Sequence, residues 1–331
     1  MTPATFDRIV ITAAFLFGIA MDAPWIFTHP QALAQNTQEV SSKAQEFPNS
    51  TLLNITDHIA FIGEDGQGHV VLALSTSRGR DGKAYQAEHF VQMHDEQQGW
   101  IKVKGNGQYD NVTEELLSIP DSQDFQYQGT AKNGLTVISP SNHFTLTLEP
   151  ISERISKKTN GGHFWIGSAP AIMEWQNRDL KGRVFYESLL LLNFNRLTHL
   201  YWDLLAEFQG FYMSFDGVGD LYLHSQEGEL MPPLIGAVNG FLTIQEETEY
   251  FQNLQLNAVD FSQGFGFYWW PDKWEAGWSS ENGSGKVQLE RSQPNNIVNW
   301  FLGGFSMGII QGEVTYKGQI HEVYGVVELL R

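Results

Sequence analysis

The sequence contains no cysteine among its 331 residues. This absence excludes disulfides, a thiolate nucleophile and any metal site built on cysteine ligands. Basic residues are also few, with 20 Lys and Arg against 38 Asp and Glu, and the formal net charge is −18. A nucleic-acid-binding protein needs a basic surface to neutralise phosphates, so we expect no nucleic acid as a partner. An anionic membrane surface is disfavoured for the same reason.

The residues that are present predict a folded protein. Hydrophobic residues make up 42% of the chain and charged residues only 18%, where about 25% is usual. The aromatic residues comprise 22 Phe, 11 Tyr and 10 Trp, whereas disordered chains are poor in aromatic side chains. A chain near 300 residues buries about 75% of its unfolded surface, so a core of its own can stabilise it without disulfides.

The N-terminal segment resembles an export signal. An apolar run over 9–21 follows Arg8, and Ala32-Leu33-Ala34 supplies a small-residue cleavage pattern before Gln35. The run is too short to span a bilayer, which takes about 20 apolar residues. We therefore expect residues 1–34 to be a signal peptide and the mature protein to be periplasmic or extracellular, with no stable transmembrane span. An uncleaved anchor and an ordinary buried segment are the alternatives.

Short runs of β-branched and aromatic residues, separated by Gly, Asn and Asp, dominate the chain from residue 52 onward. One example is the pair of runs at 69–76 and 84–93, which a glycine-rich turn connects. This spacing predicts an all-β protein made of two antiparallel β-barrels or sandwiches packed together. Residues 35–51 are expected to be a flexible leader, and residues 295–301 to form a short helical turn.

The stretch 149–162 is charged, contains Pro and Gly, and lacks aromatic residues, so we interpret it as a linker. It separates an N-terminal β-domain over 52–150 from a C-terminal β-domain over 163–331. A division near 193–198 is the alternative. A weak internal similarity between 80–88 and 178–187, each a basic and acidic turn followed by a strand with Tyr and Glu, indicates two related halves.

Glu187 is the first candidate for catalysis. It lies in a run of apolar residues over 183–192 that fills both faces of a strand. Desolvation there raises the pKa of a carboxyl and keeps it protonated at neutral pH, the state that a general acid needs. A structural salt bridge with Arg183 or Arg178 is the alternative.

Asp203 is the second candidate, because it stands among large apolar residues and shares a strand face with Glu207. Two carboxyls on one face can take different acid and base roles, although a solvated face gives the same alternation. His89 is a candidate for ligand binding, with a satisfied core histidine as the alternative. The spacing of the ten histidines shows no metal site, so we predict no metal and no cofactor.

An aromatic cluster over 265–278 includes Trp269 and Trp270. Rings of this kind line apolar cavities, stack on sugars or fill a core. We select Trp269 and Trp270 as candidate ligand-binding residues and keep core packing as the alternative.

The run from Gly182 to Glu187, followed by Tyr201-Trp202-Asp203 and the hairpin over 211–224, resembles the hydroxyneurosporene synthase (carotenoid 1,2-hydratase) and AttH-like group of double lipocalin-like proteins. The resemblance spans residue 52 to the C-terminus. It implies two lipocalin-like barrels, an apolar cavity and, in the hydratases, an acid that protonates an isoprenoid double bond before water adds. It extends to Tyr186, Glu187, Trp202 and Asp203, although Glu187 stands where the group has Asp.

We therefore expect an exported lipocalin-like protein that binds an apolar isoprenoid or lipid and hydrates or cyclises it, as a hydratase-like lyase does. Glu187 and Asp203 are the expected catalytic residues, and the expected ligand-binding residues are Tyr186, Trp202, His89, Trp269 and Trp270. A lipid carrier without chemistry is one alternative. A secreted β-sandwich that binds or cleaves carbohydrate is another, and a glycosidase would need two carboxyls facing each other across an open groove.

Overall fold

A computed structural model describes residues 52–81, 85–105, 107–109, 119, 121–159, 162–192, 207–215, 219–227, 238–244, 247–263, 269–292, 296–300 and 303–330. Nearly all of these residues lie in β-strands, and a single turn of 3-10 helix covers Pro140–Asn142. The prediction of an all-β fold with two packed lipocalin-like halves is confirmed. No helix in the described ranges is long and apolar enough to cross a membrane.

The first sheet is antiparallel and follows the order β4-β3-β2-β1-β11-β10-β8-β7-β6, with β5 paired to β3 and β9 paired to β10. Its strands are β1 (Leu52–Asp65), β2 (Gly68–Asp81), β3 (Tyr85–Asp95), β4 (Gly99–Ile101), β5 (Gly107–Tyr109), β6 (Gln126–Thr130), β7 (Gly134–Ser139), β8 (Phe144–Leu148), β9 (Ser152–Thr159), β10 (Gly162–Trp175) and β11 (Arg178–Leu192).

The second sheet follows the order β15-β14-β13-β12-β21-β20-β18-β17-β16, with β19 paired to β20. Its strands are β12 (Glu207–Phe215), β13 (Gly219–Glu227), β14 (Val238–Ile244), β15 (Glu247–Tyr250), β16 (Gln252–Gln263), β17 (Trp269–Ser280), β18 (Gly283–Arg291), β19 (Asn296–Trp300), β20 (Gly303–Tyr316) and β21 (Gln319–Leu330). The expected helical turn at 295–301 is wrong. Ile297 and Val298 are β-branched and favour the strand that pairs with β20.

The two sheets repeat one topology. β1 corresponds to β12, β10 to β20 and β11 to β21, and in each half the first strand pairs with the last. The halves are thus related, but not through the similarity between 80–88 and 178–187. The first of those segments spans the ends of β2 and β3, while the second lies in β11, which has a different place in the topology.

The first sheet extends well beyond residue 150. β9 pairs with β10 and β10 pairs with β11, so the described strands on both sides of residue 160 belong to this same sheet. The chain leaves the first sheet after β11 and enters the second at β12, so the change of sheet falls between residues 192 and 207, and the position of the domain boundary stays a prediction.

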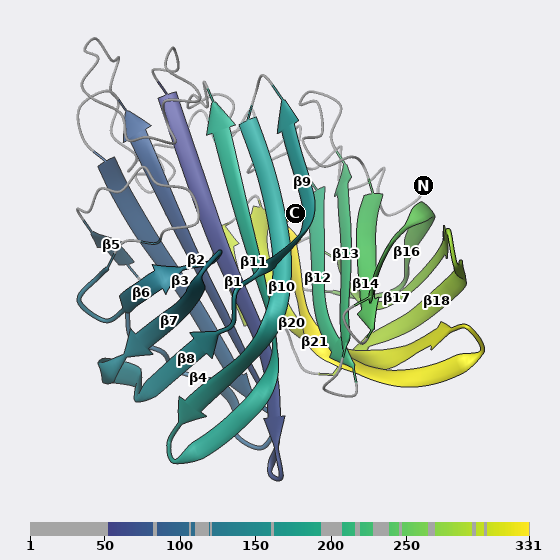
Figure 1. Cartoon of the computed structure of the whole chain (residues 1–331), viewed down its shortest axis with the longest axis horizontal. Coiled ribbons are helices and arrows are strands. Elements are labelled where there is room, and N and C mark those ends of the chain that lie inside the picture. The colour runs from purple at the N-terminus through teal and green to yellow at the C-terminus, as the bar shows by residue number, and fades with distance from the viewer. Residues whose placement is uncertain are drawn as a thin grey trace.

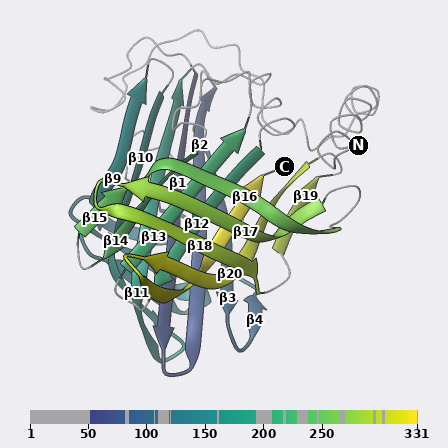
Figure 2. The same ribbon diagram turned by 90° about the vertical axis from the view of Figure 1, so that its right-hand side faces the viewer.

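Alternation along the strands produces three apolar layers. One core lies within the curl of the first sheet and another within the curl of the second. A third layer lies between the sheets and includes Phe164 and Phe185 from the first and Tyr212 and Phe241 from the second. Figure 1 shows the first sheet in purple to teal beside the second in green to yellow. In Figure 2 the second sheet lies in front, and β16, β17 and β18 run across the direction of β1 and β2.

Candidate functional site

The carboxyl of Glu187 lies in the layer between the two sheets. Phe185 and Glu187 occupy the face of β11 that packs toward the second sheet, because side chains alternate along a strand. The hydroxyl of Tyr212 donates a hydrogen bond to Glu187 Oε2 at 3.1 Å, and the hydroxyl of Tyr222 donates to the same oxygen at 3.3 Å. The first sheet therefore supplies the carboxyl, and β12 and β13 of the second sheet supply its donors.

The surroundings of Glu187 act on its pKa in opposite directions. Burial raises the pKa from 4.5 to about 7, because the charged form loses water, while the two tyrosine hydroxyls lower it by stabilising the carboxylate. Both protonation states are therefore populated near neutral pH. The alternative of a salt bridge is wrong, since Arg183 pairs with Asp220 and Arg178 pairs with Asp65 and Asp95.

A second carboxyl and a histidine lie in the same layer. His58 of β1 is the direct cross-strand partner of Glu187. Its Nε2 lies 3.3 Å from Oε1 of Glu328 on β21, and its Nδ1 lies 2.8 Å from Oγ of Ser75 on β2. The His58 and Tyr212 rings are 5.0 Å apart. These contacts form a polar group surrounded by aromatic side chains, to which both sheets contribute.

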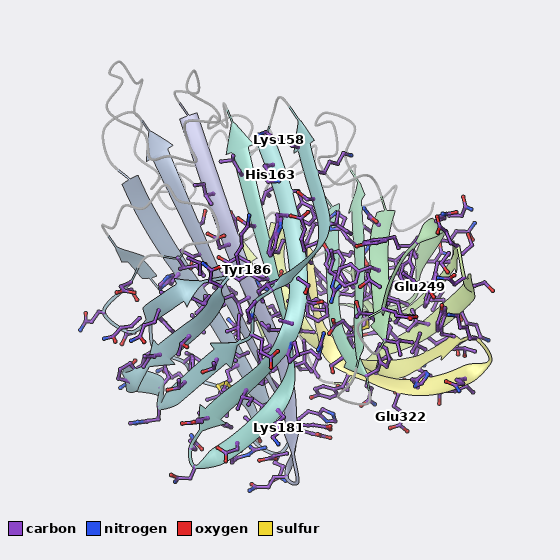
Figure 3. All side chains as sticks on the ribbon, viewed as in Figure 1. Lys158, His163, Lys181, Tyr186, Glu249 and Glu322 are labelled. Carbon is purple, nitrogen blue, oxygen red and sulfur yellow. The ribbon has the colours of Figure 1, made fainter. Side chains whose placement is uncertain are left out.

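The predicted residues Tyr186 and His89 lie elsewhere, on the concave side of the first sheet. The hydroxyl of Tyr186, which Figure 3 labels, donates a hydrogen bond to Asp57 at 3.1 Å. Both residues are buried. His89 packs against Phe125 and Tyr127. Tyr186 is adjacent to Glu187 in the strand and so faces the opposite way, which means that the ligand-binding prediction for Tyr186 and His89 concerns a separate location.

Strand register places further polar residues beside that location. Thr76 is the cross-strand partner of both Asp57 and His89, and Ser188 is the partner of Asp57 on its other side. The buried hydroxyls of Thr76 and Ser188 make no hydrogen bond with any described residue. The concave side of the first sheet thus combines an apolar core with one polar row.

The two candidate tryptophans are separated by strand alternation. Trp270 is buried in the core of the second sheet, whereas Trp269 is exposed. They do not share a surface, although either remains a candidate for ligand contact. Trp202 and Asp203 lie outside the described residues.

A cleft of about 790 Å³ opens between the sheets at the hairpin ends, away from the Glu187 carboxyl. Lys181 and Glu322, both labelled in the lower part of Figure 3, are among its lining residues. Acidic side chains outnumber basic ones in its lining, and they are Glu64, Glu96, Glu275, Glu290, Glu313 and Glu322. In the portions of the chain that the structure describes, no group of three or more His, Asp or Glu side chains is placed to hold a metal ion.

Sequence reasoning identified Glu187 but missed Glu328, His58, Tyr212 and Tyr222. Glu328 carries the same signal as Glu187, because it is a single acid within the apolar run Val326-Val327-Glu328-Leu329-Leu330. The sequence around the histidine and the tyrosines contains no pattern that distinguishes them from other residues in strands. Only the packing of one sheet on the other brings them to the carboxyls.

Fold and site together define a class, namely an all-β protein of two matched sheets with carboxyl groups buried between them. No protein-family model matches the sequence, and no curated protein is significantly similar to it. Solved structures do match the fold. A provisionally assigned AttH from Nitrosomonas europaea has a TM-score of 0.57 at 13% identity, and the match covers 91% of this chain and 99% of that one.

Two further structures share the fold. Kievitone hydratase from Nectria haematococca has a TM-score of 0.50 at 9% identity, over 91% of this chain and 97% of that one. CghA has a TM-score of 0.54 at 11% identity, over 91% and 96% respectively, and its complex with Sch210972 also matches. Identities this low establish the shared fold alone. The shared fold agrees with the two-barrel architecture that the resemblance implies, and the family itself stays a prediction.

Proposed function

We propose that this protein binds an apolar small molecule between its two sheets and catalyses a hydration, dehydration or cyclisation by proton transfer. The observation that carries the proposal is the Glu187 carboxyl, which lies among aromatic rings, accepts two tyrosine hydroxyls and has a pKa near 7. A carboxyl whose pKa lies near neutral pH populates both its protonated and its ionised form, so it can donate or accept a proton, as general acid and base catalysis requires.

The aromatic surroundings favour an alkene or polyene as substrate. Protonation of a carbon–carbon double bond creates positive charge on carbon, and the faces of aromatic rings stabilise such charge. Tyr212, Tyr222 and Phe185 supply rings of this kind in the layer between the sheets. An isoprenoid or other unsaturated lipid meets these demands.

The structural neighbours support the same class of chemistry. One is a hydratase by name, and another has been solved with the small molecule Sch210972. The proposed compartment is extracytoplasmic, with the chain cut before Gln35. Mass spectrometry of the mature N-terminus tests this part separately.

Two alternatives remain open to experiment. A carrier of the same fold would bind the molecule without changing it. A carbohydrate-active protein would use paired carboxyls across an open groove, whereas Glu328 is buried within the layer between the sheets.

The decisive experiment incubates the purified chain with a lipid extract and identifies both what is retained and what is converted. We expect retention of an unsaturated apolar compound, and conversion that falls at least 100-fold in Glu187→Gln while retention persists. Glu281→Gln, at an exposed residue in the turn between β17 and β18, is the matched control. Retention of oligosaccharide but no lipid would refute the proposal, and unchanged conversion in Glu187→Gln would remove Glu187 from the reaction.

A further inference from the structure

The second carboxyl between the sheets, that of Glu328, occupies a place equivalent to that of Glu187 but has different neighbours. β11 and β21 hold corresponding positions in the two halves, and each directs one glutamate toward the opposite sheet. Two equivalent strands therefore present a pair of carboxyls to a shared layer. The local surroundings of each carboxyl decide whether the two act alike.

Glu328 has surroundings that favour the neutral acid. Its side chain is 7% exposed, and its Oε1 accepts no hydrogen bond from the described residues. A carboxylate buried without donors is costly, so a protonated carboxyl is the stable form. Burial and the neighbouring Glu187 carboxyl accordingly raise the pKa of Glu328 well above its ordinary value.

His58 and Ser75 give the Glu328 carboxyl no group that would stabilise its charged form. Burial lowers the pKa of His58 to about 3, so the imidazole is neutral and has one N–H and one lone pair. When the Nδ1 hydrogen is donated to Ser75 at 2.8 Å, Nε2 carries no hydrogen, so His58 offers no donor to Glu328 Oε1, 3.3 Å away. This tautomer leaves Oε1 of a Glu328 carboxylate without a donor, which favours the protonated carboxyl.

Glu187 has the opposite surroundings. Two tyrosine hydroxyls donate to its Oε2, and the residue is partly exposed. Hydrogen bonds of this kind favour the carboxylate over the acid. Burial raises the pKa of Tyr212 and of Tyr222 well above 10, so both hydroxyls keep their hydrogens and remain donors.

We infer that Glu328 is the proton donor of the site and Glu187 the proton acceptor, with Ser75 as a positioning residue that keeps the neutral His58 from stabilising a Glu328 carboxylate. Pairs of carboxyls whose surroundings differ in this way divide acid and base roles. The inference rests on the proposed function and names the groups that carry it out.

The reaction balances in the hydration direction. Glu328 gives its proton to one alkene carbon, the oxygen of a water molecule bonds to the other carbon, and Glu187 takes the proton that this water releases. The product is an alcohol. Glu187 then holds the proton and Glu328 is ionised, and transfer of that proton from Glu187 to Glu328 restores the starting state. A cyclisation uses the same two groups, with loss of a proton from carbon to Glu187 in place of water addition.

The groups that set the charge of Glu328 come from four strands. They are His58 of β1, Glu187 of β11, Tyr212 of β12 and Tyr222 of β13. Of these, Glu187 is the one that titrates near neutral pH. Its ionisation strengthens the preference of Glu328 for the protonated form, since two adjacent negative charges repel each other.

A test that needs no substrate measures the infrared absorption of protonated carboxyl groups in the whole chain at pH 8. We expect a component that is present in wild type, in Glu187→Gln and in the exposed control Glu322→Gln, and that is absent from Glu328→Gln. A component that persists in Glu328→Gln and is lost in Glu187→Gln would reverse the assignment, and its absence from wild type would also overturn it.

A second measurement covers the case in which Glu328→Gln does not fold. Carbon-13 labelling of glutamate in the wild-type chain follows the carboxyl titrations by NMR. We expect one midpoint near 7 from Glu187 and a higher one from Glu328, and Ser75→Ala should lower the higher midpoint alone. Two midpoints at or below 7 would contradict the inference.

The pH dependence of turnover supplies the catalytic test. The rate should rise with pH through about 7 as Glu187 ionises, and kcat in Glu328→Gln should fall at least 100-fold with little change in KM. A rate that falls through pH 7 would make Glu187 the donor and overturn the inference. If the chain binds its ligand but converts nothing, the proposed function fails, and the infrared and NMR results still decide the state of the two carboxyls.

Discussion

At the scale of single residues, the buried groups between the sheets respond to pH in opposite directions. His58 is neutral in the fold and resists gaining a proton, whereas Glu187 and Glu328 resist losing one. The contribution of these groups to the free energy of unfolding is therefore greatest at an intermediate pH and decreases at both lower and higher pH. Substitution of single residues can show which group causes the decrease at low pH and which causes the decrease at high pH.

Glu187 should account for part of the loss of stability at high pH. Its folded pKa of about 7 lies above its unfolded value, so its stabilising contribution is complete below about pH 4.5 and is lost as the pH rises through 7. The loss is on the order of 2 to 3 kcal/mol. Glu187→Gln should flatten the curve of Tm against pH between 5 and 8 relative to Glu322→Gln, and parallel curves would refute the burial of this carboxyl.

His58 should account for part of the loss at low pH. Its folded pKa of about 3 lies below its unfolded value of 6.5, so its contribution is complete above about pH 6.5 and is lost as the pH falls toward 3. We expect His58→Phe to weaken the dependence of Tm on pH over that interval. His143→Asn, at an exposed residue with positive φ that Asn tolerates, should leave the dependence unchanged.

The sequence predicts some of these residues and not others for a physical reason. A single carboxyl in a run of apolar residues is visible locally, as at Glu187. Its donors Tyr212 and Tyr222 stand 25 and 35 residues away, in the other sheet. Their role depends on how the sheets pack, and strand periodicity contains no information about that packing.

At the scale of elements, the central strand pair of the first sheet depends on close backbone contact. Gly182 of β11 is the cross-strand partner of Gly63 of β1. A Cβ at Gly182 would lie 2.0 Å from the carbonyl oxygen of Ile62, which no side-chain rotation can relieve. The two glycines permit β1 and β11 to approach each other at this point.

Gly182→Ala should therefore destabilise the protein by about 1 to 3 kcal/mol or more, as overpacking does. Gly277→Ala on β17 is the matched control, because the nearest atom to its Cβ lies at 4.0 Å. Urea unfolding measures both variants, and equal stabilities would show that β1 and β11 are not in this register.

The composition of β9 explains why the sequence of residues 149–162 predicts a linker. β9 consists mainly of exposed polar residues, including Lys157 and Lys158, and has β10 as its strand partner. Charged side chains protect exposed strands from pairing with other chains. A strand of this kind lacks the apolar alternation on which prediction depends, whereas buried strands such as β10 and β11 show it clearly.

At the scale of the whole molecule, one buried ion pair joins the sheets. Arg183 of the first sheet donates two hydrogen bonds to Asp220 of the second, and Ser168 donates a third at 2.6 Å. Asp220 is fully buried. Removal of one partner from a buried pair leaves the other charge uncompensated, which costs about 3 to 5 kcal/mol.

We expect Asp220→Asn to lower the free energy of unfolding by that amount. The exposed pair of Lys273 and Glu290, 4.0 Å apart, provides the control, since Glu290→Gln should change stability by less than about 1 kcal/mol. Chemical denaturation followed by tryptophan fluorescence measures the difference. A loss in Asp220→Asn no larger than in the control would contradict a role for this pair in joining the sheets.

The repeated topology has a consequence for how the chain can be divided. Among the described residues, every strand pair joins two strands of the same sheet, and no pair joins the first sheet to the second. A break introduced between residues 193 and 206 would leave all of these pairs intact, so the two fragments produced together should reassemble through their side chains. Glu187 and His58 belong to one fragment and Glu328, Tyr212 and Tyr222 to the other, so neither fragment alone contains the complete proton-transfer site.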